Sequence, residues 1–150
     1  MRLEEALKQT RFESEAQKAL INIIYTSKWL NQRLYSTFKA HGLTNEQYNV
    51  LRILRGQKGN AISVNEVSSR MIDKMSNTSR LVDKLLLKGL VDRRQNKTDR
   101  RAVDLVITKA GMTLLEQIDP QVKTSQECMN VLTNEEAATM NRLLDKLTTQ

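Results

Sequence analysis

Residues Arg70–Arg101 read RMIDKMSNTSRLVDKLLLKGLVDRRQNKTDRR. This stretch holds ten Lys or Arg against four Asp, so it carries +6 of the chain's net charge of +7. The rest of the 150 residues is therefore nearly neutral. Such a concentrated positive field suits a nucleic-acid duplex, and it also fits an anionic membrane surface or a plain solvated face. The secondary-structure signals around the stretch separate these interpretations.

Three helix starts follow one another closely. Thr44–Gln47 and Ser63–Glu66 each form a capping-box pattern, which predicts a helix after each. Ser76 is predicted to cap a third helix, which ends at Gly89. A short helix, a few residues and a second helix have the spacing of a helix-turn-helix motif.

After the third helix the pattern changes to alternation, which indicates strands. Leu90–Gln95 and Ala102–Ile107 are predicted to pair as a hairpin, with turn residues at Asn96–Asp99. Together these elements form a winged helix-turn-helix. The basic residues continue through the turn, whereas a membrane-surface helix would place its charges opposite an apolar face. The membrane interpretation is therefore disfavoured.

Long helices flank this region. Apolar residues keep helical spacing over Ala16–Phe38, and Gly42 is the predicted stop. Thr108 is predicted to cap a second long helix, which Pro120 could kink or divide. A capping box at Thr133–Glu136 opens the last helix.

The apolar stripes of the flanking helices exceed what a small winged domain needs to cover itself. They predict burial against a second copy, with a monomeric helical bundle as the alternative. A twofold dimer in turn predicts a pseudo-palindromic operator.

We predict a mainly α fold with a small β-hairpin wing, in which long N- and C-terminal dimerisation helices and the winged helix-turn-helix form one intertwined structural domain. The dimerisation region comprises residues 1–42 and 108–150, and the DNA-binding region comprises residues 43–107.

The start of the third helix carries side chains suited to double-stranded DNA. A helix N-terminus attracts phosphate, short polar side chains allow close approach to the major groove, and basic residues one turn apart can reach guanine or phosphate. Asp83 is suited to restraining a neighbouring Arg. Simple helix capping is the alternative for the Ser-Asn-Thr-Ser run. The predicted contacts are Ser76, Asn77, Thr78, Ser79, Arg80 and Lys84.

The hairpin loop is the second predicted contact with DNA. It carries Lys97, Asp99, Arg100 and Arg101, and the carboxylate can hold a guanidinium in position. A loop-borne Arg fits the narrow minor groove, where negative potential is concentrated. An ordinary solvated turn is the alternative, and the preceding helices make it the weaker one.

Three segments, Thr78–Arg93, Asp99–Arg101 and Leu105–Gly111, together resemble the MarR family of bacterial transcriptional regulators. Leu43–Leu51 is similar to that family's second helix. The resemblance implies a homodimer with interleaved terminal helices and a recognition helix at Ser76–Lys88. It also implies that Asp99 steadies a minor-groove Arg101.

The resemblance further implies a repressor that loses DNA affinity when a small ligand, often phenolic and anionic, binds between the lobes. The candidate pocket residues are Tyr35, Phe38, His41 and Tyr48. Ordinary packing between the lobes is the alternative for each of them.

Other classes of function find little support in the sequence. His41 is the only histidine, and no nucleotide-binding or metalloprotease motif occurs, so we predict no enzyme, metal site or cofactor. Cys128 is the only cysteine and lies outside the first helix, where the family's peroxide-sensing branch has its reactive Cys; an inert Cys128 is expected. The absence of a membrane-spanning run or signal peptide predicts a cytoplasmic protein. A protein-interaction module remains the rival, and its binding would depend little on salt.

Overall fold

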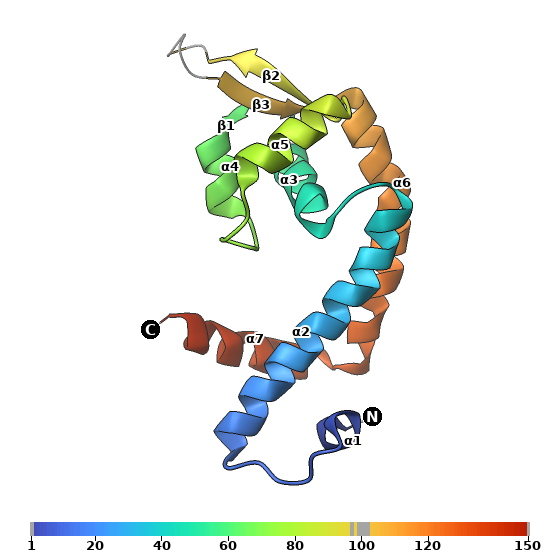
Figure 1. Ribbon diagram of the computed structural model, residues 1–150, viewed down its shortest axis with the longest axis vertical. Coiled ribbons are helices and arrows are strands. Elements are labelled where there is room, and N and C mark those ends of the chain that lie inside the picture. The colour runs from blue at the N-terminus through green and yellow to red at the C-terminus, as the bar shows by residue number, and fades with distance from the viewer. Residues whose placement is uncertain (1, 97, 99–102, 150) are drawn as a thin grey trace.

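The computed structural model describes residues 2–96, 98 and 103–149, and Figure 1 shows their arrangement. A winged lobe lies at one end of an elongated body, and the body is built from long helices (Figure 1). The elements in chain order are α1 (Leu3–Leu7), α2 (Glu15–Ala40), α3 (Asn45–Gly56), β1 (Ile62–Ser63), α4 (Val64–Arg70), α5 (Thr78–Leu87), β2 (Val91–Gln95), β3 (Val103–Ile107), α6 (Lys109–Gln126), the 3-10 helix η1 (Glu127–Val131) and α7 (Asn134–Thr148).

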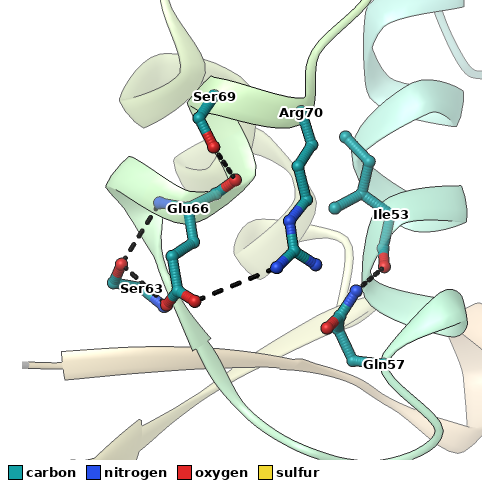
Figure 2. Close-up of polar contacts among 6 residues, drawn as sticks. All are labelled: Ile53, Gln57, Ser63, Glu66, Ser69 and Arg70. Carbon is teal, nitrogen blue, oxygen red and sulfur yellow. Dashed lines mark hydrogen bonds and ion pairs between the residues drawn. The ribbon is translucent and has the colours of Figure 1, made fainter.

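The predicted helix starts at three capping boxes are confirmed. At Thr44, Ser63 and Thr133 the side chain accepts a hydrogen bond from the third backbone N–H, and the Gln or Glu at that position accepts one from the capping residue's N–H. Figure 2 shows the box at the start of α4, where Glu66 also accepts from the Ser63 hydroxyl at 3.1 Å and lies 4.0 Å from Arg70. These reciprocal bonds satisfy N–H groups that a helix start otherwise leaves unpaired.

The wing has one strand more than the sequence predicts. β2 and β3 pair antiparallel with Val91 opposite Ile107, as the alternation predicts, and β1 pairs with the other edge of β3. Strand β1 has only two residues, Ile62 opposite Leu105 and Ser63 opposite Asp104. Two residues are too few for a periodic signal, so tertiary contact with β3 decides this strand.

One hydrophobic core holds the lobe together and continues into α6. Leu51 and Leu54 of α3, Leu85 of α5 and Leu105 of β3 are almost completely buried in one cluster with Leu115 of α6. Gly111 lets α6 approach the wing, because a Cβ there would collide with the Leu90 carbonyl oxygen and lie 2.7 Å from Ile107 Cγ1. The N-terminal half of α6 is therefore packed as part of the lobe.

The body consists of α2, α6 and α7. α2 runs beside α6, and α7 crosses α2 at the far end from the wing (Figure 1). α2 ends as predicted, with His41 at its C-cap and Gly42 at φ +70°. α6 runs through Pro120 as a single helix, so the proline does not divide it.

The apolar stripes of the body are uncovered in the single chain. Leu20 is 57% exposed and Leu143 50%, whereas the lobe core is almost fully buried. Other large apolar side chains exposed on α2 and α7 are Ile23, Ile24, Trp29, Tyr35, Met140, Leu144 and Leu147. None of the helices in the described part of the chain is both long and apolar enough to cross a membrane.

Candidate nucleic-acid interface

The predicted recognition helix is α5, and its N-cap lies one residue later than the sequence predicts. Asn77, not Ser76, is the N-cap: its Oδ1 accepts from the Arg80 N–H at 3.0 Å. The expected start was wrong because Ser76 belongs to the preceding turn, where its N–H donates to the Asp73 carbonyl oxygen. Asp73 also accepts from the Met75 N–H through its side chain, and this local bonding holds the turn.

The faces of α5 divide the predicted contacts into two groups. Val82 and Leu85 point into the core, and Thr78 lies with them at 5% exposure. Arg80 and Lys84 lie on the opposite, exposed face, together with Ser79. The outer face of α5 is therefore polar and basic and is positioned by an apolar inner face.

Ser76 and Thr78 are not placed as contacts on that outer face. The hydroxyl oxygens of both are buried, without a hydrogen-bond partner among the described residues. Thr78 is covered because it falls on the same side of the helix as Val82, one turn later. Periodicity could have found this, since Thr78, Val82 and Leu85 share one helical face. In this structure the hydroxyls of Ser76 and Thr78 are therefore not exposed on the face that carries Arg80 and Lys84.

An ion pair ties α5 to the wing. Asp83 Oδ1 accepts from a guanidinium nitrogen of Arg93 on β2 at 2.8 Å, and both side chains are more than half exposed. The sequence predicts that Asp83 restrains a neighbouring Arg of the helix; in the structure Asp83 pairs instead with Arg93 on β2, ten residues further along the chain. Because Asp83 pairs with Arg93, it does not pair with Arg80 or Lys84. Among the described residues, no carboxylate lies within ion-pair distance of either of these two side chains.

The tip of the wing is described only in part. Lys97, Asp99, Arg100 and Arg101 lie outside the described residues. At the edge of the tip, Asn96 donates to Asp104 Oδ2 at 2.8 Å and accepts from the Thr98 N–H. These bonds hold the beginning of the turn against β3.

The second predicted site, the candidate ligand pocket, is only partly assembled from the expected residues. Phe38 and Tyr48 stack with ring centroids 4.0 Å apart and line a cavity of about 510 Å³ between body and lobe. Tyr35 is 47% exposed and does not line it. His41 also lies outside it, and its Nε2 is 3.1 Å from Gln121 Nε2 on α6.

The mainly apolar lining of the cavity includes polar and charged side chains that the sequence did not predict. Arg52 contributes a positive charge, Glu46 and Asp73 contribute negative ones, and the buried Asn45 Oδ1 has no partner among the described residues. Burial raises the pKa of Tyr48 above its ordinary value. These residues come from α3 and the turn before α5, and no local pattern predicts that the two segments meet.

Comparison with known proteins gives a consistent result. Residues 41–102 match the model of the MarR family. The chain is 27% identical over 122 residues to the transcriptional repressor MprA of Escherichia coli K12, an alignment that spans 81% of this chain and 67% of MprA. It is 29% identical over 128 residues to the multiple antibiotic resistance protein MarR of Salmonella typhimurium, spanning 83% of this chain and 88% of that one. Over residues 41–102 and in these relatives, the chain is similar to members of the MarR family.

A solved structure extends the likeness from sequence to shape. A cysteine-to-serine mutant of MarR from Escherichia coli, complexed with operator DNA, superposes with a TM-score of 0.76 at 25% identity, covering 92% of this chain and 99% of that one. The predicted winged-helix fold is thereby confirmed, as is the family resemblance. MprA of Escherichia coli is named as a transcriptional repressor, and YetL of Bacillus subtilis, 27% identical over 100 residues, is named as one as well.

Proposed function

We propose that this chain is a homodimeric MarR-family repressor that binds a pseudo-palindromic operator in double-stranded DNA. The observation that carries the proposal is the outer face of α5, where Arg80 and Lys84 stand exposed and without acidic partners among the described residues. Support comes from MarR of Escherichia coli, whose structure with operator DNA has the same fold.

The proposed contacts follow from the shape of the lobe. α5 enters the major groove with Ser79, Arg80 and Lys84 toward base edges and phosphates, because the opposite face is held in the core. The free N–H groups at the start of α5 face phosphate oxygens. The wing reaches the adjacent minor groove, where Lys97, Arg100 and Arg101 are the proposed cations and Asp99 steadies Arg101.

In the proposed homodimer, a second copy of the chain packs against the exposed apolar side chains of the body. The exposed apolar side chains of α2 and α7 flank a groove of about 830 Å³ lined by Ile23, Met140 and Leu143, among others. Apolar patches of this kind mark protein–protein interfaces. In this assembly residues 1–42 and 108–150 form the dimerisation region and residues 43–107 the DNA-binding region.

A small ligand in the cavity beside Phe38 and Tyr48 is the proposed effector. The aromatic stack suits a ring. Among the charged groups of the lining, which include Glu46 and Asp73, the Arg52 guanidinium is the one that suits an anionic or phenolic substituent. Because body and lobe both contribute to the lining, a ligand there would favour one angle between them over another. We place the repressor in the cytoplasm, where it meets chromosomal DNA.

Selection from a random pool of duplex DNA tests the proposal. The expected product is an inverted repeat with half-sites about 10 base pairs apart or a multiple of that spacing. Binding to it should weaken steeply between about 50 and 200 mM salt, because phosphate contacts release counterions. A folded protein that enriches no sequence, or whose binding is insensitive to salt, would favour a protein-interaction module instead.

A further inference from the structure

Between α4 and α5 the chain forms a projecting loop of residues 71–77 (Figure 1). Met75 of this loop is 92% exposed. An isolated exposed apolar side chain is common on protein surfaces, so exposure alone does not mark a site. Met75 stands out by its place in the chain, because only Ser76 separates it from Asn77, the N-cap of the helix that we propose to enter the major groove.

The backbone of this loop is held by hydrogen bonds on both sides of Met75. The Ile72 N–H donates to Asn49 Oδ1 on α3 at 2.9 Å. Asp73 accepts from the Met75 N–H through its carboxylate at 2.9 Å and from the Ser76 N–H through its carbonyl oxygen at 3.3 Å. Local bonds of this kind fix the conformation of a turn. The loop therefore presents the Met75 side chain from a defined position next to the start of α5.

The polar side chains at this end of α5 are buried or already engaged. The hydroxyl oxygens of Ser76 and Thr78 are buried. The side-chain oxygen of Asn77 caps α5 by accepting from the Arg80 N–H at 3.0 Å. Within residues 75–78, Met75 is therefore the side chain that combines full exposure with the length to reach a base edge.

An apolar side chain at this place matches one chemical group of the major groove. The C5 methyl group of thymine is the apolar feature that distinguishes one base there, whereas the other distinguishing groups are hydrogen-bond donors and acceptors. The unbranched, polarizable thioether of methionine adapts its shape to such a contact. Contact between the methyl group and the Met75 side chain removes apolar surface of both from water, which favours binding.

We propose that Met75 is a specificity-determining residue that contacts the C5 methyl group of one thymine in each half-site of the operator. In the proposed dimer each copy presents one Met75, so the two contacted thymines lie at symmetric positions of the inverted repeat. The contact adds sequence preference without adding charge, so it depends less on salt than the phosphate contacts do. This inference rests on the proposed DNA-binding function.

Replacement of thymine by deoxyuridine tests the contact, because it removes the C5 methyl group and keeps every hydrogen-bonding group of the base. Each thymine of the operator selected by the wild type is replaced in turn, at the symmetric positions of both half-sites. Titration of the labelled operators measures affinity. At one of these positions the wild type is expected to bind about 3- to 5-fold more weakly for each methyl group lost.

Variants of the protein assign this loss to Met75. Met75→Ala is expected to bind the thymine and deoxyuridine operators equally, with an unchanged melting temperature because the side chain is exposed. Met75→Leu keeps an apolar side chain and should retain part of the preference for thymine. Leu87→Ala is the matched control: Leu87, at the other end of α5, is 89% exposed, and its loss should leave the preference at this thymine as in the wild type.

Failure of this inference is distinguishable from failure of the proposed function. Selected half-sites without thymine, or a wild type that tolerates deoxyuridine at every position, would overturn the contact while operator binding stands. The same holds for a Met75→Ala protein that keeps the full preference for thymine over deoxyuridine, even where its overall affinity is lower. A wild type that enriches no inverted repeat contradicts the proposed function itself, and this inference with it.

Discussion

Asn77 shows how one side chain can serve two roles that compete. Its amide could read a base in the major groove, and its oxygen can also cap α5. In the structure the oxygen is engaged with the Arg80 N–H at 3.0 Å, so capping is the role it performs in the free protein. Arg80 and Lys84 remain as the exposed residues of α5 with the longest reach.

Replacing Asn77 therefore tests how much its capping hydrogen bond contributes to the stability of the fold. Asn77→Ala is expected to lower the free energy of unfolding by about 0.5–2 kcal/mol, because the N–H that Asn77 caps loses its acceptor. Urea unfolding measures this. Asn77→Asp keeps a capping oxygen and should stay close to the wild type. Equal losses in both variants would show that the cap contributes little.

Arg80 carries the corresponding prediction for binding. Arg80→Ala is expected to weaken operator binding by about 1–3 kcal/mol, because a guanidinium in the groove is lost. Titration of labelled operator measures the effect. Lys28→Ala removes the same charge from α2 and should change affinity little. Similar losses of operator affinity in Arg80→Ala and Lys28→Ala would show that Arg80 contributes only to the overall positive charge of the protein and makes no specific contact in the groove.

The first turn of α4 carries a pH-dependent element of stability. Hydrogen bonds from the Ser63 backbone and hydroxyl hold the pKa of Glu66 below its usual value. The ionised form is thus favoured by folding, so its contribution is present above the unfolded pKa and disappears as pH falls through the lower folded pKa. Figure 2 shows these donors around the carboxylate.

Glu66→Gln isolates that contribution. The amide keeps an acceptor but cannot titrate, so the variant should lose less stability than the wild type between pH 6 and about pH 3. Urea midpoints across this range provide the comparison. Parallel pH curves for the two proteins would exclude the carboxylate as a source of acid sensitivity.

The contact between α6 and the wing depends on a missing side chain. Gly111→Ala is expected to destabilise the fold by about 1–3 kcal/mol, because the new methyl group overlaps the Leu90 carbonyl oxygen. Gly56→Ala is the matched control: a Cβ at Gly56 has no neighbour within 4 Å among the described residues. Thermal unfolding of Gly111→Ala and Gly56→Ala measures the difference. Equal melting temperatures of the two variants would contradict the close approach of α6 to the wing at Gly111.

At the scale of the whole molecule, the exposed stripe predicts assembly. Leu143→Glu places a charge on the proposed dimer face and should shift the protein toward monomer, because burial of an unpaired carboxylate is costly. Sedimentation velocity measures the change. Asn65→Glu adds the same charge on the lobe and should leave the oligomeric state unaltered. A Leu143→Glu protein that sediments like the wild type would move the dimer interface elsewhere.

The sequence by itself determined the elements whose signals are local. Capping boxes at Thr44, Ser63 and Thr133 locate helix starts because their bonds reach only three residues along the chain. The alternation around the basic turn likewise locates the hairpin. The basic stretch and its order of elements were enough to predict a winged helix-turn-helix that binds DNA, and the resemblance to the MarR family came from the motifs within Thr78–Gly111.

Tertiary structure alone decided the features that join distant segments. Strand β1 exists only as a partner of β3, and the Arg55–Asp119 pair links residues 64 positions apart. The cavity brings Phe38 together with Asp73. Such contacts depend on how completed helices pack, and side-chain spacing along one segment carries no information about a partner on another.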